Sequence, residues 1–400
     1  MKKTLLFLGL IATMVLSAQN VDDQKLNFNY IQLPSSPLKG VSTFNIVVDH
    51  SIYQKSNEDS LTVFESQLNI AEAQLTTWVE QKKKIDQMYL LEMSKWEKLT
   101  NAGTITAQPI KQPYPEMPRL KEELLMPILT EEISDGTVDG AVKLEGFSKG
   151  EGGATITLQF SGIQNTKIIE KKTGTGAATK YEYTAQYLMP VNVKIEVPGQ
   201  GIVLNENINL SQNSKVINKY DSKYDFEYWQ IENLGNFWKT TQQAELNQIL
   251  ASVNNLINDR CGFPLKSYSS EIYTVKKYKD HNYNDLIDAY TKAKSGYDLI
   301  YKSASRKEAE PNLKKAIAIW EAALSEGNTL DNKARINDKV IALLYVNIAE
   351  AYLWMGDYTL ADNYIQKAKI SNEGAGKYRR QANGLEDLMN LLKVRELANQ

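Results

Sequence analysis

The feature that most constrains the fold is a pair of helix-spaced apolar runs near the C-terminus, separated by a single glycine. The segment 343–370 reads LLYVNIAEAYLWMGDYTLADNYIQKAKI. Apolar and small residues recur every three or four positions on both sides of Gly356, as on the buried face of a helix. Ala349 and Ala361 are small enough to let two antiparallel helices approach closely, and Gly356 permits a tight turn. The segment therefore predicts a helical hairpin.

This hairpin resembles a tetratricopeptide repeat at nearly every signature position. The positions that match are Tyr345, Ala349, Tyr352, Gly356, Tyr358, Ala361 and Ala368. One departure is that Ser371-Asn-Glu-Gly374 stands where the repeat usually has a proline. The resemblance covers about 284–400 and implies a short array of about five helices, which would present a concave surface to a peptide or helix of another protein.

The N-terminal half follows a different periodicity. Phe44, Ile46 and Val48 alternate with their neighbours, and the runs 156–160 and 191–197 alternate in the same way, as half-buried strands do. Glycine-rich turns separate these runs. This pattern predicts a β-rich domain over 19–219, built as a small sandwich or an open antiparallel sheet.

A long helical insertion interrupts the β-rich domain over about 59–130. Apolar residues follow helical spacing from about Asp59 to Leu99, which corresponds to roughly 60 Å of helix. A small sheet cannot bury such a length, so we expect the helix to pair with another helix or to protrude. Four prolines at 109, 113, 115 and 118 follow, and we interpret them as a return loop rather than a proline-rich ligand motif.

Residues 220–283 predict a strand–helix–strand unit, and whether it forms one domain with the first sheet stays open. The complete expectation is an α+β fold. Phe226, Tyr228 and Trp229 suggest its first strand, the run 246–257 is amphipathic, and Ile272 with Val275 marks the last strand. Trp229 and Trp238 could stack on sugar rings, but a role in the core is the favoured interpretation.

The first twenty residues predict a signal peptide over 1–18. Lys2 and Lys3 precede a 12-residue apolar run, and Ser17 and Ala18 supply small residues at a cleavage site. The LSAQ ending resembles signal peptides common in Bacteroidota. Because the only cysteine is Cys261, a lipoprotein anchor at this site is not available. We expect a periplasmic or peripherally outer-membrane-associated protein without a membrane span.

The composition argues against several kinds of site. Two histidines and one cysteine are too few for most His- or Cys-rich metal centres, and no calcium-loop motif occurs. A net charge of -2 gives no broad basic face for nucleic acid. We therefore predict no metal, no cofactor and no nucleic-acid partner.

Residues that could carry catalysis have more plausible structural roles. Cys261 could act as a nucleophile with His281 as its base, but it follows a helix and should be part-buried. His50 and His281 are expected at the surface, and Gly174-Thr-Gly176 is expected to form a hairpin turn. The acidic pairs Glu122–Glu123 and Glu131–Glu132 lie in helix-like, water-facing sequence, where nothing selects a glycosidase pair.

The preferred hypothesis is therefore a non-catalytic adaptor in the cell envelope that binds another envelope protein through its C-terminal repeats. By resemblance, outer-membrane assembly, secretion or motility complexes are its expected settings. The alternative is a glycan- or peptidoglycan-binding envelope protein.

Overall fold

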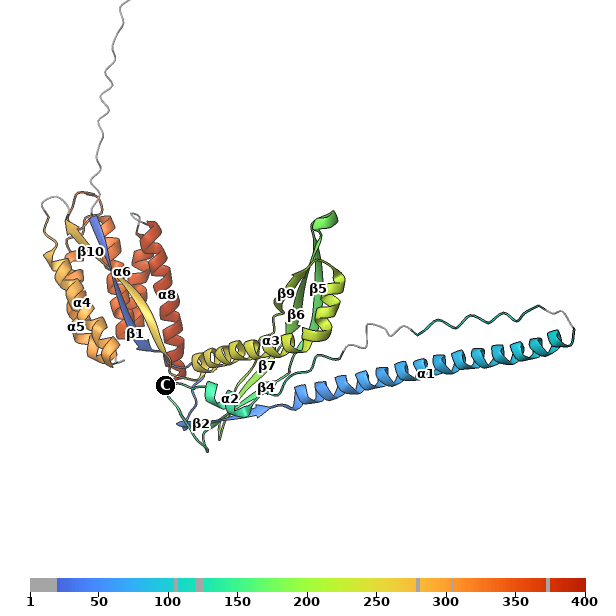
Figure 1. The fold of residues 1–400 in the computed structure, drawn as a ribbon. Helices are drawn as coiled ribbons and strands as arrows, with labels where there is room; N and C mark the ends of the chain where they lie inside the picture. Colours follow the sequence, from blue (N-terminus) through green and yellow to red (C-terminus); the bar gives the residue numbers. More distant parts are fainter. Residues whose placement is uncertain (1–19, 104–106, 119–125, 278–280, 304–305, 372–374) are drawn as a thin grey trace, which may run out of the picture. The chain divides into compact units, whose positions relative to one another are not determined.

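A computed structural model describes the chain in six stretches, 20–103, 107–118, 126–277, 281–303, 306–371 and 375–400 (Figure 1). The chain divides into two compact units. Unit 1 contains 20–38, 144–147 and 256–400, and unit 2 contains 39–143 and 148–255. The predicted signal peptide over 1–18 lies outside the described residues.

The predicted α+β class is confirmed, with antiparallel sheets toward the N-terminus and a helical array at the C-terminus. The main sheet of unit 2 has five strands in the order β3-β2-β4-β7-β8. Their bounds are β2 Thr43–Asp49, β3 Ser148–Lys149, β4 Ala154–Phe160, β7 Val191–Val197 and β8 Gly201–Ile208.

Strand β2 is the exception to the antiparallel pattern, since it runs parallel to both of its neighbours. Phe44 pairs with Ala154 and Asp49 with Gln159, whereas β4 pairs with β7 in antiparallel register. A parallel pair requires a long crossover, which the helical insertion between β2 and β4 supplies. Alternate residues of β4 and β7, including Ile156, Leu158 and Val193, are fully buried.

A second sheet of unit 2 has three antiparallel strands in the order β5-β6-β9, with bounds Gln164–Thr173, Lys180–Leu188 and Asn213–Tyr220. Gly174 lies between β5 and β6 with a φ of 79°, so the predicted hairpin connection is confirmed. Rings of α3 (Lys223–Arg260) pack on β6, where Phe226 stacks on Tyr183 at 3.5 Å.

That packing corrects one prediction. The aromatic run Phe226, Tyr228 and Trp229 was expected to form a strand, but it lies in the first turns of α3. Strands do precede and follow the helix, as β9 and β10, but they pair with different partners. The run places rings at i, i+2 and i+3, a spacing that fits a strand and a helix about equally well.

The predicted insertion forms α1, a helix of 51 residues over Ser51–Asn101 that is about 75 Å long. Residues 107–118, called the strap below, run back along it. The indole N–H of Trp78 donates to the carbonyl of Pro115 at 2.8 Å, and the hydroxyl of Tyr114 donates to Asp86 at 2.6 Å. The interpretation of the prolines as a return loop is thus confirmed. A short helix, α2 (Asp135–Ala141), follows.

Unit 1 is built around a ribbon of two long antiparallel strands, β1 (Asn20–Ile31) and β10 (Leu265–Lys277). Five helices complete the unit. Their bounds are α4 Asn284–Ser303, α5 Arg306–Leu324, α6 Asp338–Met355, α7 Tyr358–Ile370 and α8 Ala375–Ala398. Side chains of the ribbon and of these helices share one hydrophobic core.

The two units cut across the predicted domain boundaries. Strand β1 was assigned to the β-rich domain over 19–219 and β10 to the unit over 220–283, but the two strands pair along their length and pack on the helical array. In the described stretches of the chain, no helix is long and apolar enough to cross a membrane.

Candidate interaction site in the helical array

The helices α6 and α7 form the predicted hairpin, and its three predicted alanines are buried. Ala349 and Ala361 are fully buried, and Ala368 is nearly so. Gly356 ends α6 in the left-handed conformation, with a φ of 83°. The side chain of Asp357 then caps α7 by accepting a hydrogen bond from the backbone N–H of Leu360.

The tyrosines among these residues take polar partners on other helices. Tyr352 stacks on Tyr364 at 5.8 Å, and the Tyr364 hydroxyl donates to Glu321 of α5 at 2.7 Å. The ring of Tyr345 lies 6.0 Å from the ring of Tyr364 and is tilted by 48° to it. The hydroxyl of Tyr358 donates to Glu396 of α8 at 2.6 Å, and burial raises the pKa of Tyr358 to about 12.

The chain's own ribbon covers one face of α4 and α6. Phe28 of β1 stacks on Tyr297 of α4 at 5.1 Å and meets Trp354 of α6 edge-on at 4.9 Å. Tyr268 of β10 contacts the same indole at 5.0 Å. A partner therefore has to bind elsewhere on the array.

Two amide side chains hold the outer edge of β10 through its backbone. The Asn347 amide accepts from the backbone N–H of Tyr273 at 2.9 Å and donates to its carbonyl at 2.8 Å. The Gln381 amide of α8 donates to the carbonyl of Glu271 at 3.0 Å. Backbone groups two residues apart point to the same edge of a strand, so those of Ser269 face this edge too.

A groove of about 590 Å³ lies alongside this edge, between β10 and α8, and is called the β10 groove below. Ser269, Glu271 and Tyr273 line one side, and Lys377, Arg380 and Gly384 line the other. A side chain added at Gly384 would meet no atom within 4 Å of its Cβ, so the groove is open at that point.

The charge of the groove is mainly positive on the α8 side. Lys377 and Arg380 are both exposed, and the Lys377 ammonium lies 4.7 Å from the centre of the Tyr273 ring. The carboxylate of Glu271 faces Lys25 of β1 at 3.9 Å. This arrangement favours an acidic ligand, whose carboxylates would reach the cations on α8.

A buried carboxylate lies beneath Tyr268, in the core under the ribbon. Glu350 of α6 is 1% exposed, and among the described residues no group donates a hydrogen bond to either of its oxygens. Burial raises its pKa to about 7, although the nearby Ser270 and Tyr268 hydroxyls lower it in part. Glu350 is therefore a carboxyl of the core and does not line the β10 groove.

The residues that were considered for catalysis lie in structural positions. Cys261 is fully buried, which keeps its thiol from solvent, and His281 hydrogen-bonds the Lys333 carbonyl at 3.0 Å. His50 was expected to be a solvated surface residue, but both of its ring nitrogens have protein partners. They form hydrogen bonds with Asp135 at 2.6 Å and with the hydroxyl of the buried Tyr53 at 3.0 Å.

Of the two acidic pairs, one lies in the part of the chain that the structure describes. Glu131 and Glu132 are exposed as expected but lie in extended chain instead of a helix, and Glu122–Glu123 falls outside the described residues. No cluster of three or more His, Cys, Asp or Glu side chains that could hold a metal ion occurs within the described ranges.

Sequence reasoning missed the buried Asn347, which holds β10, and the groove residues Gln381 and Gly384. Asn347 offered a signal, because it is a lone amide in the apolar run of α6 and a buried amide needs hydrogen-bond partners. Gln381 and Gly384 look like ordinary surface residues until the neighbouring strand is known.

The chain was compared with protein-family models, curated proteins and solved structures. No protein-family model, curated protein or solved structure matches the chain.

Proposed function

We propose that the protein is a non-catalytic adaptor of the bacterial cell envelope that binds an extended, acidic segment of another envelope protein in the β10 groove. The observation that carries the proposal is the hold of Asn347 and Gln381 on the backbone of β10 beside an open groove. Because the backbone groups of Tyr273 and the carbonyl of Glu271 are already bonded, an incoming strand would add to this edge by main-chain hydrogen bonds at Ser269.

The setting follows from the sequence. A signal peptide over 1–18 would export the chain, and the tetratricopeptide-like hairpin around Gly356 is typical of proteins that bind other proteins. A complex for outer-membrane assembly, secretion or motility is the setting that this resemblance implies. Lys377 and Arg380 select an acidic segment over a basic one.

The first test measures binding of a glutamate-rich peptide and a lysine-rich peptide of equal length by fluorescence anisotropy. The glutamate-rich peptide should bind, and changing both Lys377→Glu and Arg380→Glu should weaken it at least about tenfold. Lys393→Glu is the matched control, because Lys393 is exposed on α8 and does not line the groove. If Lys393→Glu weakened binding as much as the double variant, the peptide would respond to the net charge of the protein and not to the groove.

The second test blocks the groove without disturbing the core. Gly384→Trp fills open space, whereas Asn390→Trp places the same side chain at an exposed position of α8 outside the groove. A partner captured from envelope fractions should be lost only with Gly384→Trp. If the Gly384→Trp variant still captures the partner, the partner does not bind in the β10 groove.

The alternative of glycan or peptidoglycan binding has weaker support. Trp238 is buried and meets Tyr187 and Phe237 edge-on, so its faces are not available to a sugar ring. Trp229 is half-buried and stacks on Phe226 at 5.8 Å. A pull-down on purified cell wall tests this alternative, and retention that depends on Trp229 would favour it.

A further inference from the structure

Helix α1 carries a line of apolar residues that stay exposed in the described part of the chain. Ile52, Val63, Ile70, Met88 and Leu99 are between 39% and 57% exposed. Together with Gln81 they recur at intervals of 11, 7, 11, 7 and 11 residues. An α-helix returns to the same direction every 18 residues, so all six lie on one side of α1. These six residues are called the apolar line below.

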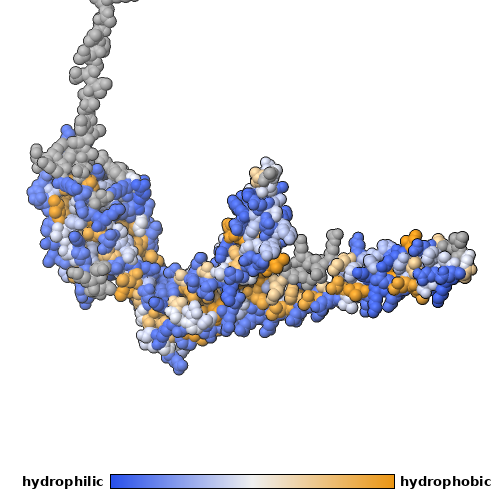
Figure 2. Space-filling view, in the orientation of Figure 1, coloured by the Kyte–Doolittle hydropathy of each residue, from blue (hydrophilic) through white to orange (hydrophobic). Residues whose placement is uncertain are grey.

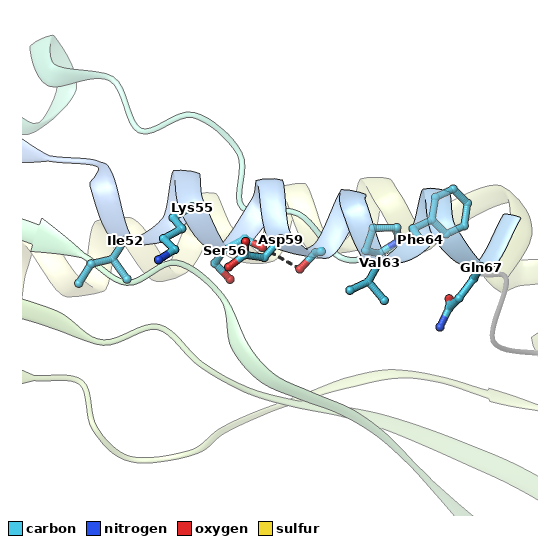
Figure 3. Close-up of a pocket in the computed structure, with 9 residues that line it drawn as sticks. Ile52, Lys55, Ser56, Asp59, Val63, Phe64 and Gln67 are labelled. Carbon is cyan, nitrogen blue, oxygen red and sulfur yellow. Dashed lines mark hydrogen bonds between the residues drawn. The ribbon is translucent and has the colours of Figure 1, made fainter. Parts of the chain in front are cut away.

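The strap runs along a different side of the helix. It contacts α1 through Trp78, Asp86 and Met93, none of which belongs to the apolar line. Figure 3 shows Ile52 and Val63 pointing to one side of α1 with Lys55 and Asp59 between them, while Phe64 points elsewhere. On the face drawn in Figure 2, hydrophobic residues recur along α1 and the strap.

Shallow hollows accompany the line along the first part of the helix. One of about 580 Å³ includes Ile52 and Val63 and is bordered by Pro127. Another of about 430 Å³ includes Ile70 and Gln81 and is bordered by Glu116 and Pro118 of the strap, so the line runs beside the strap and not beneath it. Such hollows can receive side chains of a facing helix, as in the knobs-into-holes contact of paired helices.

The spacing of the line is symmetric about its centre. The centre of the line lies between residues 75 and 76. The six residues form three pairs whose members are equally far from this centre: Ile52 with Leu99, Val63 with Met88, and Ile70 with Gln81. When two copies of α1 lie antiparallel across this point, every residue of the line meets its counterpart. A self-complementary surface of this kind is what a two-fold dimer requires.

The charges of α1 favour the same arrangement. Residues 51–80 contain one lysine and five acidic residues, whereas residues 81–101 contain five lysines and three acidic residues. Antiparallel pairing sets the acidic half of each helix against the basic half of the other. Parallel pairing would set like against like, which destabilises an interface.

We propose that α1 binds α1 of a second copy of this chain along the apolar line, in antiparallel orientation. Ile70 then faces Gln81 on either side of the dyad, and Asp59 lies within one helical turn of Lys95 of the second copy. The strap forms an ion pair with α1 between Lys111 and Asp86, whereas neither Asp59 nor Lys95 has an ion-pair partner in the part of the chain that the structure describes. The polar Gln81 fixes the register, as a lone polar residue does in paired helices.

The dimer is tested by sedimentation equilibrium of the full mature chain. The wild-type chain should show a monomer–dimer equilibrium, and Val63→Glu and Met88→Glu should each raise the dimer Kd more than about tenfold, since each change occurs twice in the interface. Leu90→Glu is the control, because Leu90 is 66% exposed but lies off the apolar line. A monomeric wild type, or an equal effect of Leu90→Glu, would refute the proposal.

The orientation is tested by disulfide cross-linking. A mixture of Ile70→Cys and Gln81→Cys chains should cross-link under mild oxidation, and neither variant should cross-link alone. In the antiparallel register the two copies of residue 70 lie about 16 Å apart along the axis, too far for a disulfide. Cross-linking of either variant alone would show parallel pairing. The native Cys261 is buried and does not interfere.

Charge reversal gives an independent readout. Asp59→Lys and Lys95→Glu should each weaken the dimer, and a chain that carries both changes should regain most of the lost affinity. Failure of the double variant to recover would contradict the pairing of these two positions. Circular dichroism of each variant verifies that α1 remains helical, as expected for exposed substitutions.

Discussion

Helices α6 and α1 show two ways in which this chain keeps a helix in place. In α6, 13 of 18 residues are buried, and they include the polar Asn347 and Glu350. In α1, Tyr53 is the only buried residue among 51. Packing therefore stabilises α6, whereas α1 depends on local helix propensity, on the strap and, in our proposal, on a second copy.

The difference determines where function can lie. The surroundings of α6 are filled by the ribbon, so polar groups there must find partners inside the chain. Outside the contact with the strap, most side chains of α1 are exposed in the described part of the chain. Substitutions should therefore be costly around α6 and mild on α1, and four predictions follow this order.

The largest effect is expected at Trp354, which is fully buried against Phe28, Tyr30 and Tyr268. Trp354→Ala should lower the free energy of unfolding of unit 1 by about 4 kcal/mol, because it leaves a large cavity. Urea unfolding followed by circular dichroism measures this loss. A loss below about 1 kcal/mol would mean that the ribbon is not held by α6.

A pH-dependent effect is expected at Glu350. The folded pKa of about 7 exceeds the ordinary value of 4.5, so the unfolded chain ionises first as pH rises. The contribution of the neutral Glu350 carboxyl to the free energy of unfolding is therefore fully present below pH 4.5, and it is lost as the pH rises to 7. Glu350→Gln removes this loss and should stabilise unit 1 by about 3 kcal/mol at pH 8 but hardly at pH 4.

Melting curves of both proteins between these two pH values provide the measurement. An equal effect of the substitution at pH 4 and pH 8 would show that the carboxyl does not titrate in the folded protein.

A smaller effect is expected at Asn347. Asn347→Ala removes two hydrogen bonds and leaves the backbone groups of buried Tyr273 without partners, at a cost of about 2 kcal/mol. Hydrogen exchange of the Tyr273 amide should accelerate strongly. Unchanged protection of that amide would mean that the side chain does not hold β10.

The smallest effect is expected on α1, at the contact with the strap. Trp78→Phe keeps an aromatic ring and removes only the hydrogen bond to Pro115, so the expected loss is about 1 kcal/mol or less. Limited proteolysis of the strap and thermal melting measure the change. If Trp78→Phe lowered the free energy of unfolding as much as Trp354→Ala does, α1 would depend on packing as strongly as α6, which contradicts the comparison.

Local patterns predicted much of the fold. Periodicity located the helical hairpin around Gly356 and the long helix of the insertion, because both depend on residues close together in sequence. The pairing of β1 with β10 could not be predicted, since more than 230 residues separate the strands and the contact depends on tertiary packing. For the same reason the β10 groove, formed by that strand and α8, stayed hidden.

The alternation in Phe226, Tyr228 and Trp229 was misleading for a different reason. Aromatic residues favour strands when they are considered alone, but here the rings pack on β6 from the start of α3. The local pattern fits a strand or a helix, and the packing of these rings on β6 favours the helix.

The most direct test of the adaptor proposal is site-specific photo-cross-linking in cells that export the protein. A photoreactive residue at position 384 faces the β10 groove, and the same residue at position 390 lies on α8 outside it. Position 384 should cross-link to an acidic, extended segment of one envelope protein, and position 390 should not. Equal cross-linking at both positions, or none at 384, would contradict the account.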